Sequence, residues 1–177
     1  MRATTALVWL ATLLYPLAIW LGLARFEPRW LAPVLLALAL LRAVVSREPV
    51  WLAAAAGATV LVALAWIGND GLPLKLYPVL VNATLLALFA LSLWRPPTVI
   101  ERLARLTNPQ LPAQAIPYVT RVTQVWCGFF ICNGGIALWT ALAGSDAAWA
   151  LYNGVIAYLL IGALLLGERL LRPRHAS

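Results

Sequence analysis

Residues Leu74–Trp94 read LKLYPVLVNATLLALFALSLW, and this stretch decides the fold class of the chain. Its one charged residue, Lys75, is next to the first position. A helix that crosses about 30 Å of hydrocarbon needs about 20 predominantly apolar residues. The stretch is therefore long and apolar enough to be a membrane-spanning helix.

The composition of the whole chain supports the same interpretation. Of 177 residues, 63% are hydrophobic and 11% are charged, and the mean hydropathy is +0.87. Soluble domains have about a quarter of their residues charged, so this chain has too few to cover a surface that faces water. The composition excludes a soluble enzyme, a disulfide-stapled secreted module, a disordered chain and a nucleic-acid-binding domain. It indicates an all-α, polytopic membrane bundle.

Six apolar stretches predict a single membrane domain over residues 1–177, with about six spans. Turn residues separate them, as in Gly68-Asn69-Asp70-Gly71 and Gly144-Ser145-Asp146. A five-span arrangement with a re-entrant second stretch is the alternative. The first stretch is too long for the apolar region of a cleaved signal peptide, so we expect it to be retained. The predicted spans are residues 4–23, 30–45, 50–68, 74–94, 118–143 and 147–167.

The distribution of Lys and Arg predicts the orientation, because cytoplasmic loops are enriched in these residues. With the N-terminus inside, ten of the 13 basic residues fall on the cytoplasmic side, and Arg25, Arg29 and Lys75 fall outside. We therefore expect both termini in the cytoplasm. The net charge of +7 then reflects topology and contact with anionic lipid, and indicates no nucleic-acid partner.

One connection is long enough to contain a further element. Thr98 and Glu101 form the T-x-x-E pattern of a capping box, and Asn108-Pro109 predicts the end of a helix. We expect a cytoplasmic amphipathic helix at about Thr98–Asn108, which either lies on lipid or docks a cytoplasmic biosynthetic enzyme. Its expected apolar face comprises Val99, Ile100, Leu103 and Leu106, with Glu101, Arg102 and Arg105 opposite.

Residue types that carry common catalytic chemistry are sparse. The one histidine, His175, is near the C-terminus, and Cys127 and Cys132 lie about 140° apart around one helix, so they are expected to be unpaired packing residues. This pattern predicts no metal site, no cofactor and no His base for a nucleophile. The acidic residues are dispersed, with none at mid-membrane. We expect no catalytic residues.

Uncharged polar and aromatic side chains in the last three spans are the candidate binding residues. A spacing of three or four residues places Thr123, Trp126, Phe130, Asn133, Ala137 and Thr140 on one stripe of the fifth span, and Trp149, Tyr152, Asn153 and Ile156 on one stripe of the sixth. Asn82, Asn133 and Asn153 lie about 12, 15 and 9 Å from the outer ends of their spans, at about 1.5 Å per residue.

Two interpretations of the three asparagines remain open. An amide in hydrocarbon needs a partner, so each should face the bundle interior. They either form interhelical hydrogen bonds beside packing glycines or line a cavity for the polar end of an amphiphile. Arg121 could hold a lipid phosphate, pair with Glu168, or extend to the membrane surface. The candidate ligand-binding residues are Asn82, Arg121, Trp126, Asn133, Thr140, Trp149, Tyr152 and Asn153, and the candidate packing glycines are Gly134, Gly135, Gly154 and Gly162.

Several ordered motifs resemble a family of small, multi-span bacterial inner-membrane proteins associated with gene clusters for aryl polyene and xanthomonadin-type pigments. A weaker likeness is to the intracellular septation protein A family. The resemblance covers roughly residues 70 to 172. The motifs are Lys75–Asn82, Arg121–Trp126, Phe129-Phe130, Asn133-Gly134, Trp139-Thr140, Trp149–Gly154, Tyr158–Gly162 and Glu168.

The resemblance implies a protein of the bacterial inner membrane that takes part in the production of envelope lipid or pigment. The first hypothesis is a non-enzymatic accessory protein that binds or presents a lipid-linked intermediate. The second is a transporter or flippase of an amphiphile, with a homodimer supplying the pathway. The third is a membrane acyl- or glycosyl-transferase, which the absence of an acid–base pair disfavours. The expected partners are membrane lipid and cytoplasmic biosynthetic enzymes.

Overall fold

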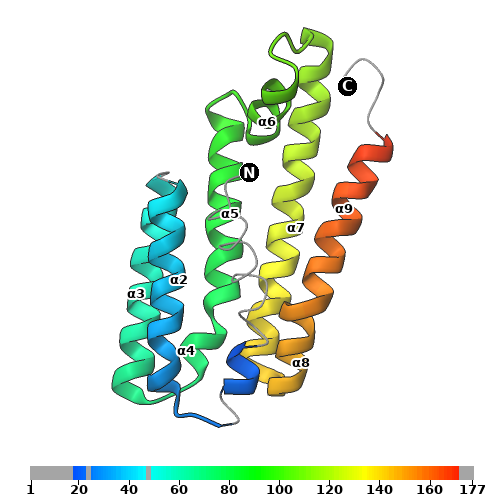
Figure 1. Ribbon diagram of the computed structural model, residues 1–177. Helices are drawn as coiled ribbons and strands as arrows, with labels where there is room; N and C mark the ends of the chain where they lie inside the picture. The colour runs from blue at the N-terminus through cyan, green and yellow to red at the C-terminus, as the bar shows by residue number, and fades with distance from the viewer. Residues whose placement is uncertain (1–17, 23–24, 47–48, 172–177) are drawn as a thin grey trace.

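The computed structural model describes residues 18–22, 25–46 and 49–171. Helices dominate these residues, and no strand occurs in these ranges (Figure 1). The predicted all-α architecture is therefore confirmed. Most of the predicted first span, residues 4–17 and 23, lies outside the described residues, as does His175. The helices are α2 (Pro28–Ser46), α3 (Pro49–Gly68), α4 (Leu72–Lys75), α5 (Tyr77–Trp94), α6 (Val99–Thr107), η1 (Ala113–Ala115), α7 (Ile116–Ala143), α8 (Asp146–Leu151), η2 (Tyr152–Ile156) and α9 (Ala157–Leu171).

Three helical segments are long and apolar enough to cross a membrane. They cover Leu72–Trp94, Ala113–Ala143 and Asp146–Leu171, with 23, 31 and 26 residues. At about 1.5 Å per residue each exceeds the roughly 30 Å of a hydrocarbon core. The helices α2 and α3 have 19 and 20 residues. Within them, Trp30–Leu41 and Leu52–Gly68 form shorter apolar helices, so the count of six spans stays a prediction.

Local sequence explains where the helices begin and end. Proline lies in the first turn of α4, α5 and α7, where its missing N–H costs no helical hydrogen bond. The hydroxyl of Ser145 accepts a hydrogen bond from the Ala148 N–H and caps α8. After α3, Asn69 has a φ of 48°, a left-handed conformation that Asn tolerates and that reverses the chain toward α4. These signals place the helix boundaries close to the predicted ones.

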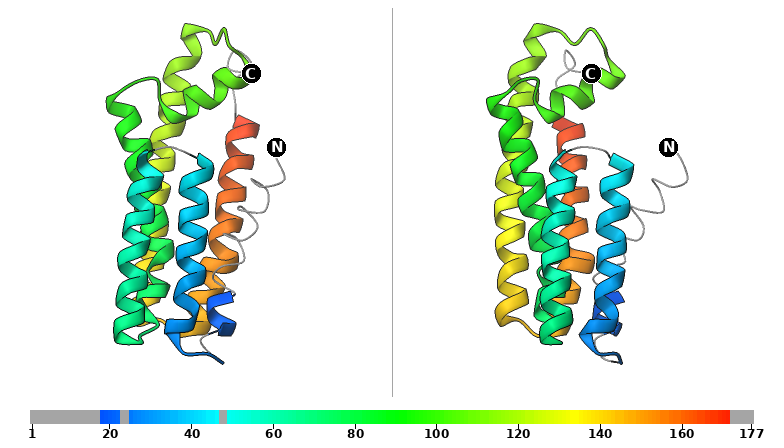
Figure 2. Two further views of the ribbon diagram at one scale, coloured as in Figure 1. Left: turned by 60° about the vertical axis from the view of Figure 1, so that its left-hand side comes forward. Right: turned by 90° about the vertical axis from the view of Figure 1, so that its left-hand side faces the viewer.

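The helices α3, α5 and α7 stand in one row, with α2 and α9 packed on the same side of it (Figure 2). The fifth and sixth predicted spans pack on each other mainly where α7 meets α8 and η2. The helix α7 packs most extensively on α5 and much less on α9. A Cβ at Gly134 would lie 3.1 Å from the Asn82 Cβ. The missing side chain of Gly134 therefore lets α5 approach α7.

The other predicted packing glycines differ from Gly134. A Cβ at Gly135 or Gly162 would meet nothing within 4 Å, so neither glycine marks a close helix contact among the described residues. Both are exposed, whereas Gly134 and Gly154 are half-buried. Adjacent helical positions point in directions about 100° apart, so Gly134 faces α5 and Gly135 does not.

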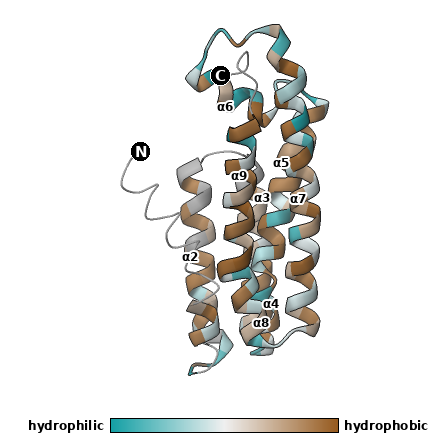
Figure 3. Ribbon diagram, turned by 90° about the vertical axis from the view of Figure 1, so that its right-hand side faces the viewer, coloured by the Kyte–Doolittle hydropathy of each residue, from teal (hydrophilic) through white to brown (hydrophobic). Residues whose placement is uncertain are grey.

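Most of the outer surface of the long helices is apolar (Figure 3). In the most apolar 18 residues of each segment, only 28% are buried inside the protein for Leu72–Trp94, 33% for Ala113–Ala143 and 22% for Asp146–Leu171. Large side chains such as Leu91, Ile131 and Leu142 are more than half exposed. An apolar surface of this extent needs a non-aqueous environment, which supports assignment to a membrane.

The predicted helix is present as α6, and Glu101 on its polar face is buried. The N–H of Glu101 donates to Thr98 Oγ1 over 3.2 Å and begins α6 as expected. Glu101 is 6% exposed and its carboxylate pairs with Arg105, whereas Leu103 and Leu106 are exposed. Ile100 and Ala104 pack on a small core at the start of α7. Of the predicted apolar face, Val99 and Ile100 pack on the bundle and Leu103 and Leu106 stay exposed, whereas the burial of Glu101 results from contact with α7, which the helical pattern does not encode.

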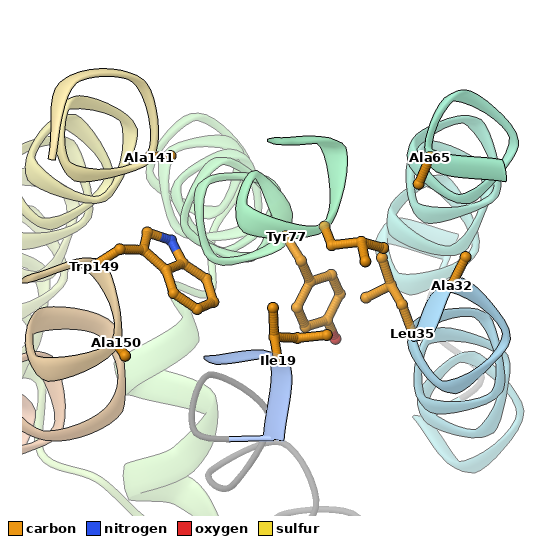
Figure 4. Packing of buried hydrophobic residues seen from close by; sticks show 9 residues of the cluster. Ile19, Ala32, Leu35, Ala65, Tyr77, Ala141, Trp149 and Ala150 are labelled. Carbon is orange, nitrogen blue, oxygen red and sulfur yellow. The ribbon is translucent and has the colours of Figure 1, made fainter. Parts of the chain in front are cut away.

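A hydrophobic core closes the end of the bundle that contains α4 and α8 (Figure 4). Tyr77 and Trp149 lie at its centre, with Ile19 and Leu35 packed beside them. The indole N–H of Trp149 donates to the backbone carbonyl of Lys75 over 3.1 Å. The Lys75 ammonium pairs with Asp146 at the same end. These contacts fix α4 against α8 and so hold the polar residues of α5 and η2 at a common level.

Candidate functional site

Three helices meet through a buried chain of polar side chains. The Asn133 amide on α7 donates to Asn82 Oδ1 on α5 over 3.0 Å. The Tyr152 hydroxyl, on the last chain segment, donates to Asn133 Oδ1 over 2.9 Å. Asn82 donates in turn to the Pro78 carbonyl. This chain supports the interpretation of Asn82 and Asn133 as interhelical hydrogen-bonding residues.

Asn153 belongs to a separate set of hydrogen bonds. Its amide N–H groups donate to the Trp149 carbonyl over 2.9 Å and to Thr140 Oγ1 over 3.3 Å. The Thr140 hydroxyl itself donates a hydrogen bond to the Ala137 carbonyl. Because the Trp149 carbonyl can only accept, the amide nitrogen of Asn153 must face it, and the orientation of the amide is settled.

The Asn153 Oδ1 is then left without a hydrogen-bond donor. The residue is 4% exposed, and this oxygen is the one buried side-chain polar atom without a partner in the described part of the chain. A buried acceptor that receives no hydrogen bond costs about 1–3 kcal/mol. Such an atom therefore marks a position where a hydrogen-bond donor would be favoured.

A cavity of about 80 Å³ lies beside the three asparagines, between α5, α7 and the η2–α9 segment. Asn82, Asn133 and Asn153 all line it, as the cavity interpretation expected. No acidic or basic side chain lines it within the described ranges. The cavity is therefore neutral, with apolar and aromatic walls. Its other lining residues are Tyr77, Pro78, Val81, Leu85, Phe129, Phe130, Ala157, Tyr158 and Ile161.

A wide helical turn sets which residues of the last span face inward. Tyr152–Ile156 form a π-helix, which takes more residues per turn than an α-helix. The predicted stripe fails at this point, because Ile156 is exposed and Ala157 is buried instead. Ile161 and Leu164 then follow on the inner face and pack on the aromatic cluster. The turn thus carries Asn153 and the later residues of α9 on one continuous face.

A larger groove lies between α7 and α9, near the end of the bundle that contains α6. Its volume is about 300 Å³. The exposed Arg121 and the half-buried Tyr118 and Glu168 line this groove. The Tyr118 hydroxyl donates to the Glu168 backbone carbonyl over 3.1 Å. Apolar residues complete the walls, namely Val122, Val125, Trp126, Ala163, Leu164, Gly167 and Leu171.

Arg121 and Glu168, which the sequence suggested as one possible pair, line the same groove. The ion pairs among the described residues join Lys75 to Asp146 and Arg105 to Glu101. Arg121 takes part in neither of them. Arg121 is exposed and lines the groove, so an anionic group could bind there.

Two tryptophans of the predicted set do not line the asparagine cavity. Trp126 is buried in an aromatic cluster with Phe89 and Phe130, at ring-centroid distances of 6.2 and 5.6 Å, and lines the groove. Trp149 is 1% exposed and belongs to the core at the opposite end. The predicted site therefore divides into a polar cavity, an aromatic cluster and a groove.

Three aromatic lining residues were missed as candidate site residues. Phe129 and Tyr158 line the cavity, and Tyr118 lines the groove. Phe129 precedes Asn133 by four residues and Tyr118 precedes Arg121 by three, so helical spacing would have placed both near predicted residues. Tyr158 had no such signal, because the π-turn changes the spacing after Asn153.

Side chains that commonly bind metal ions are dispersed in the described part of the chain. In the described ranges, no three His, Cys, Asp or Glu side chains gather into a potential metal site. Cys127 and Cys132 are free thiols, as predicted from their angular separation. The site can thus offer apolar contact, the basic Arg121, the acidic Glu168 and one open amide oxygen.

Comparisons with protein-family models, curated proteins and solved structures found no match for this chain.

Proposed function

We propose that this protein is a non-enzymatic membrane protein that binds an amphiphilic, lipid-linked intermediate as an accessory to the production of envelope lipid or pigment. The observation that carries the proposal is the groove between α7 and α9, whose walls are mostly apolar and whose charged residues, among those described, are the exposed Arg121 and the half-buried Glu168. The resemblance to proteins associated with polyene pigment clusters suggests a polyene or related acyl chain as the ligand.

The chemistry of the groove suits an amphiphile. Apolar walls favour an acyl or polyene chain through the burial of apolar surface, and ligand sites typically combine such walls with a few polar groups. A guanidinium matches the oxygens of phosphate or carboxylate in a bidentate fashion. A ligand with an anionic head at Arg121 and a hydrophobic chain along Val122 and Leu164 would satisfy both parts.

The proposed orientation places the groove at the cytoplasmic side. Six spans with both termini inside would put Arg121 on the inner surface, where soluble synthases could deliver or collect the ligand. The exposed Leu103 and Leu106 of α6 lie at the same end of the bundle (Figure 1). These residues suit contact with lipid or with a cytoplasmic biosynthetic enzyme. The inner membrane of a bacterium is the compartment consistent with this arrangement.

Mass spectrometry of lipids that copurify with the full-length protein tests the proposal. We expect a distinct anionic lipid to be enriched on the wild type and reduced at least fivefold on Arg121→Gln, since a charge-assisted hydrogen bond contributes about 1.5–3 kcal/mol. Arg102→Gln, at an exposed arginine outside the groove, is the matched control and should retain the lipid. Equal recovery of bulk phospholipid from all three proteins would contradict the proposal.

Transport of the amphiphile is the second candidate function. The groove and the asparagine cavity both lie along α7 and α9, which favours a path for the ligand along these helices. Reconstituted vesicles with a fluorescent lipid would test it. Faster exchange between leaflets with the wild type than with Arg121→Gln would support transport, and equal rates would leave binding as the function.

A further inference from the structure

The cavity and the groove follow one another along the same pair of helices. On α7, Val122, Phe129 and Asn133 succeed one another from the groove into the cavity. On the last segment, Leu164, Ile161 and Asn153 do the same in the reverse chain direction. In both series of lining residues, the steps are mainly three or four residues or multiples of these, so each series follows one face of its helix.

The two polar ends of this path differ in chemistry. Arg121 at the groove is a permanent cation and binds anions. Asn153 lines the cavity, and its buried Oδ1 is a neutral acceptor whose hydrogen-bonding capacity is unused by the described residues. The twelve positions from Arg121 to Asn133 correspond to about 18 Å at about 1.5 Å per residue. Between them lie the rings of Trp126 and Phe130, with Ile161 and Leu164 packed against them.

We propose that the amphiphile carries a neutral hydrogen-bond donor, such as a hydroxyl group, at the end of its chain far from the anionic head, and that Asn153 Oδ1 in the asparagine cavity binds this donor. The inference rests on the proposed function, because the head group is held at Arg121. The apolar chain lies over the aromatic cluster, and its terminal group enters the cavity between α5, α7 and η2.

The cavity selects against other terminal groups. A carboxylate or phosphate would face a carbonyl oxygen with no cation in the cavity, and burial of an unpaired charge is strongly unfavourable. An ammonium would also lack a carboxylate partner among the described lining residues. A methyl terminus would leave Oδ1 without a donor. A neutral hydroxyl satisfies the oxygen at the lowest desolvation cost.

Matched ligands on the wild-type protein test the inference without a variant. The probes are hexadecanoic acid, its analogue with a terminal hydroxyl, and the methyl ether of that analogue, measured by displacement of a fluorescent fatty acid from the full chain in lipid nanodiscs. The methyl ether retains an oxygen but has no proton to donate. We expect the hydroxyl analogue to bind about three- to tenfold more tightly than the other two, as one net hydrogen bond predicts.

Two variants place the discrimination at the cavity. Asn153→Leu should bind all three probes with the same affinity, because the acceptor is gone. Thr84→Val, at a buried threonine of α5 that lines neither the cavity nor the groove, leaves the Asn153 amide and its partners in place and should retain the preference for the hydroxyl. If Asn153→Leu does not fold, the comparison of hydroxyl and methyl ether on the wild type and on Thr84→Val still decides the question.

The outcomes separate this inference from the proposed function. Equal affinities of the three probes on the wild type, all weakened by Arg121→Gln, would overturn the inference and support the groove; water in the cavity would produce this result. A preference that persists in Asn153→Leu would also overturn it. If none of the probes binds the wild type, the proposed function fails together with the inference.

Discussion

The Asn133 amide lies 3.0 Å from Asn82 Oδ1 and joins α7 to α5 inside the bundle. The two asparagines are 5% and 8% exposed, so water does not compete for the contact. Gly134 is adjacent to Asn133 and leaves room for the Asn82 backbone to approach. Helix packing and hydrogen bonding therefore act at the same level of α5 and α7. Asn153, whose oxygen is not used in such a contact, has the different role proposed above.

Replacing Asn133 should destabilise the fold. Asn133→Leu leaves both Asn82 Oδ1 and the Tyr152 hydroxyl without their partner, so we expect a loss of about 1–3 kcal/mol in the free energy of unfolding. A double-mutant cycle with Asn82→Leu, followed by thermal unfolding in detergent, should give a coupling energy of about 0.6 kcal/mol. Ile131→Leu, at an exposed position of α7, is the control. A coupling energy of zero would contradict the role of the contact.

Two adjacent glycines should respond oppositely to alanine. A Cβ at Gly134 would lie 3.1 Å from a Cβ that is fixed to the α5 backbone, whereas a Cβ at Gly135 meets nothing within 4 Å. Gly134→Ala should therefore be about 1–3 kcal/mol less stable than the wild type, as for other overpacked contacts. Gly135→Ala should be neutral or slightly more stable, because alanine favours helix. Equal melting temperatures for the two variants would show that α5 and α7 do not approach closely at Gly134.

At the end of the bundle that contains α4 and α8, a buried hydrogen bond should contribute more than an exposed ion pair. Trp149→Phe removes the donor to the Lys75 carbonyl from a side chain that is 1% exposed, and we expect a loss of about 1–3 kcal/mol. Asp146→Asn removes an ion pair whose carboxylate side chain is 56% exposed, so its cost should be at most about 1 kcal/mol and should decrease with added salt. Thermal unfolding at low and high ionic strength measures both. A larger effect for Asp146→Asn would reverse the ranking.

Labelling of single cysteines tests the proposed orientation. In a variant with Cys127 and Cys132 replaced by alanine, Asn108→Cys should react with a membrane-impermeant maleimide only after the cells are opened. Ser145→Cys should react in intact cells, because it lies at the opposite end of α7. The exposed Ile131→Cys, within the apolar region, should react in neither condition. The reverse pattern for Asn108→Cys and Ser145→Cys would invert the orientation.

Sequence reasoning predicted the helices well because their signals are local. The apolar run of Leu74–Trp94, the turn at Asn69 and the cap at Ser145 each depend on neighbouring residues. The burial of Asn82, Asn133 and Asn153 also followed from a general rule, since an amide in hydrocarbon is costly unless it has a partner. The open oxygen of Asn153 did not follow, because it depends on which acceptors its amide nitrogen meets.

A regular period predicts neither the contacts between helices nor a change of residue spacing within one helix. The buried side of α6 contains Glu101 because Ile100 and Ala104 pack against the start of α7. Ile156 turns outward because the π-turn changes the residue spacing. Trp126 and Trp149 share the predicted set but lie in different clusters.

The sequence by itself determined that the chain is helical, apolar and bounded by turns at defined positions, since these properties arise from hydrogen bonds within a segment and from the transfer of side chains out of water. Tertiary structure decided that α7 packs on α5, that Asn82 bonds Asn133, and that Arg121 and Glu168 share one groove. Such relationships join residues about 50 positions apart, and their geometry depends on helix rotation and separation. A rotation of one helix, or a shift of a few ångströms in the distance between two helices, would break these contacts.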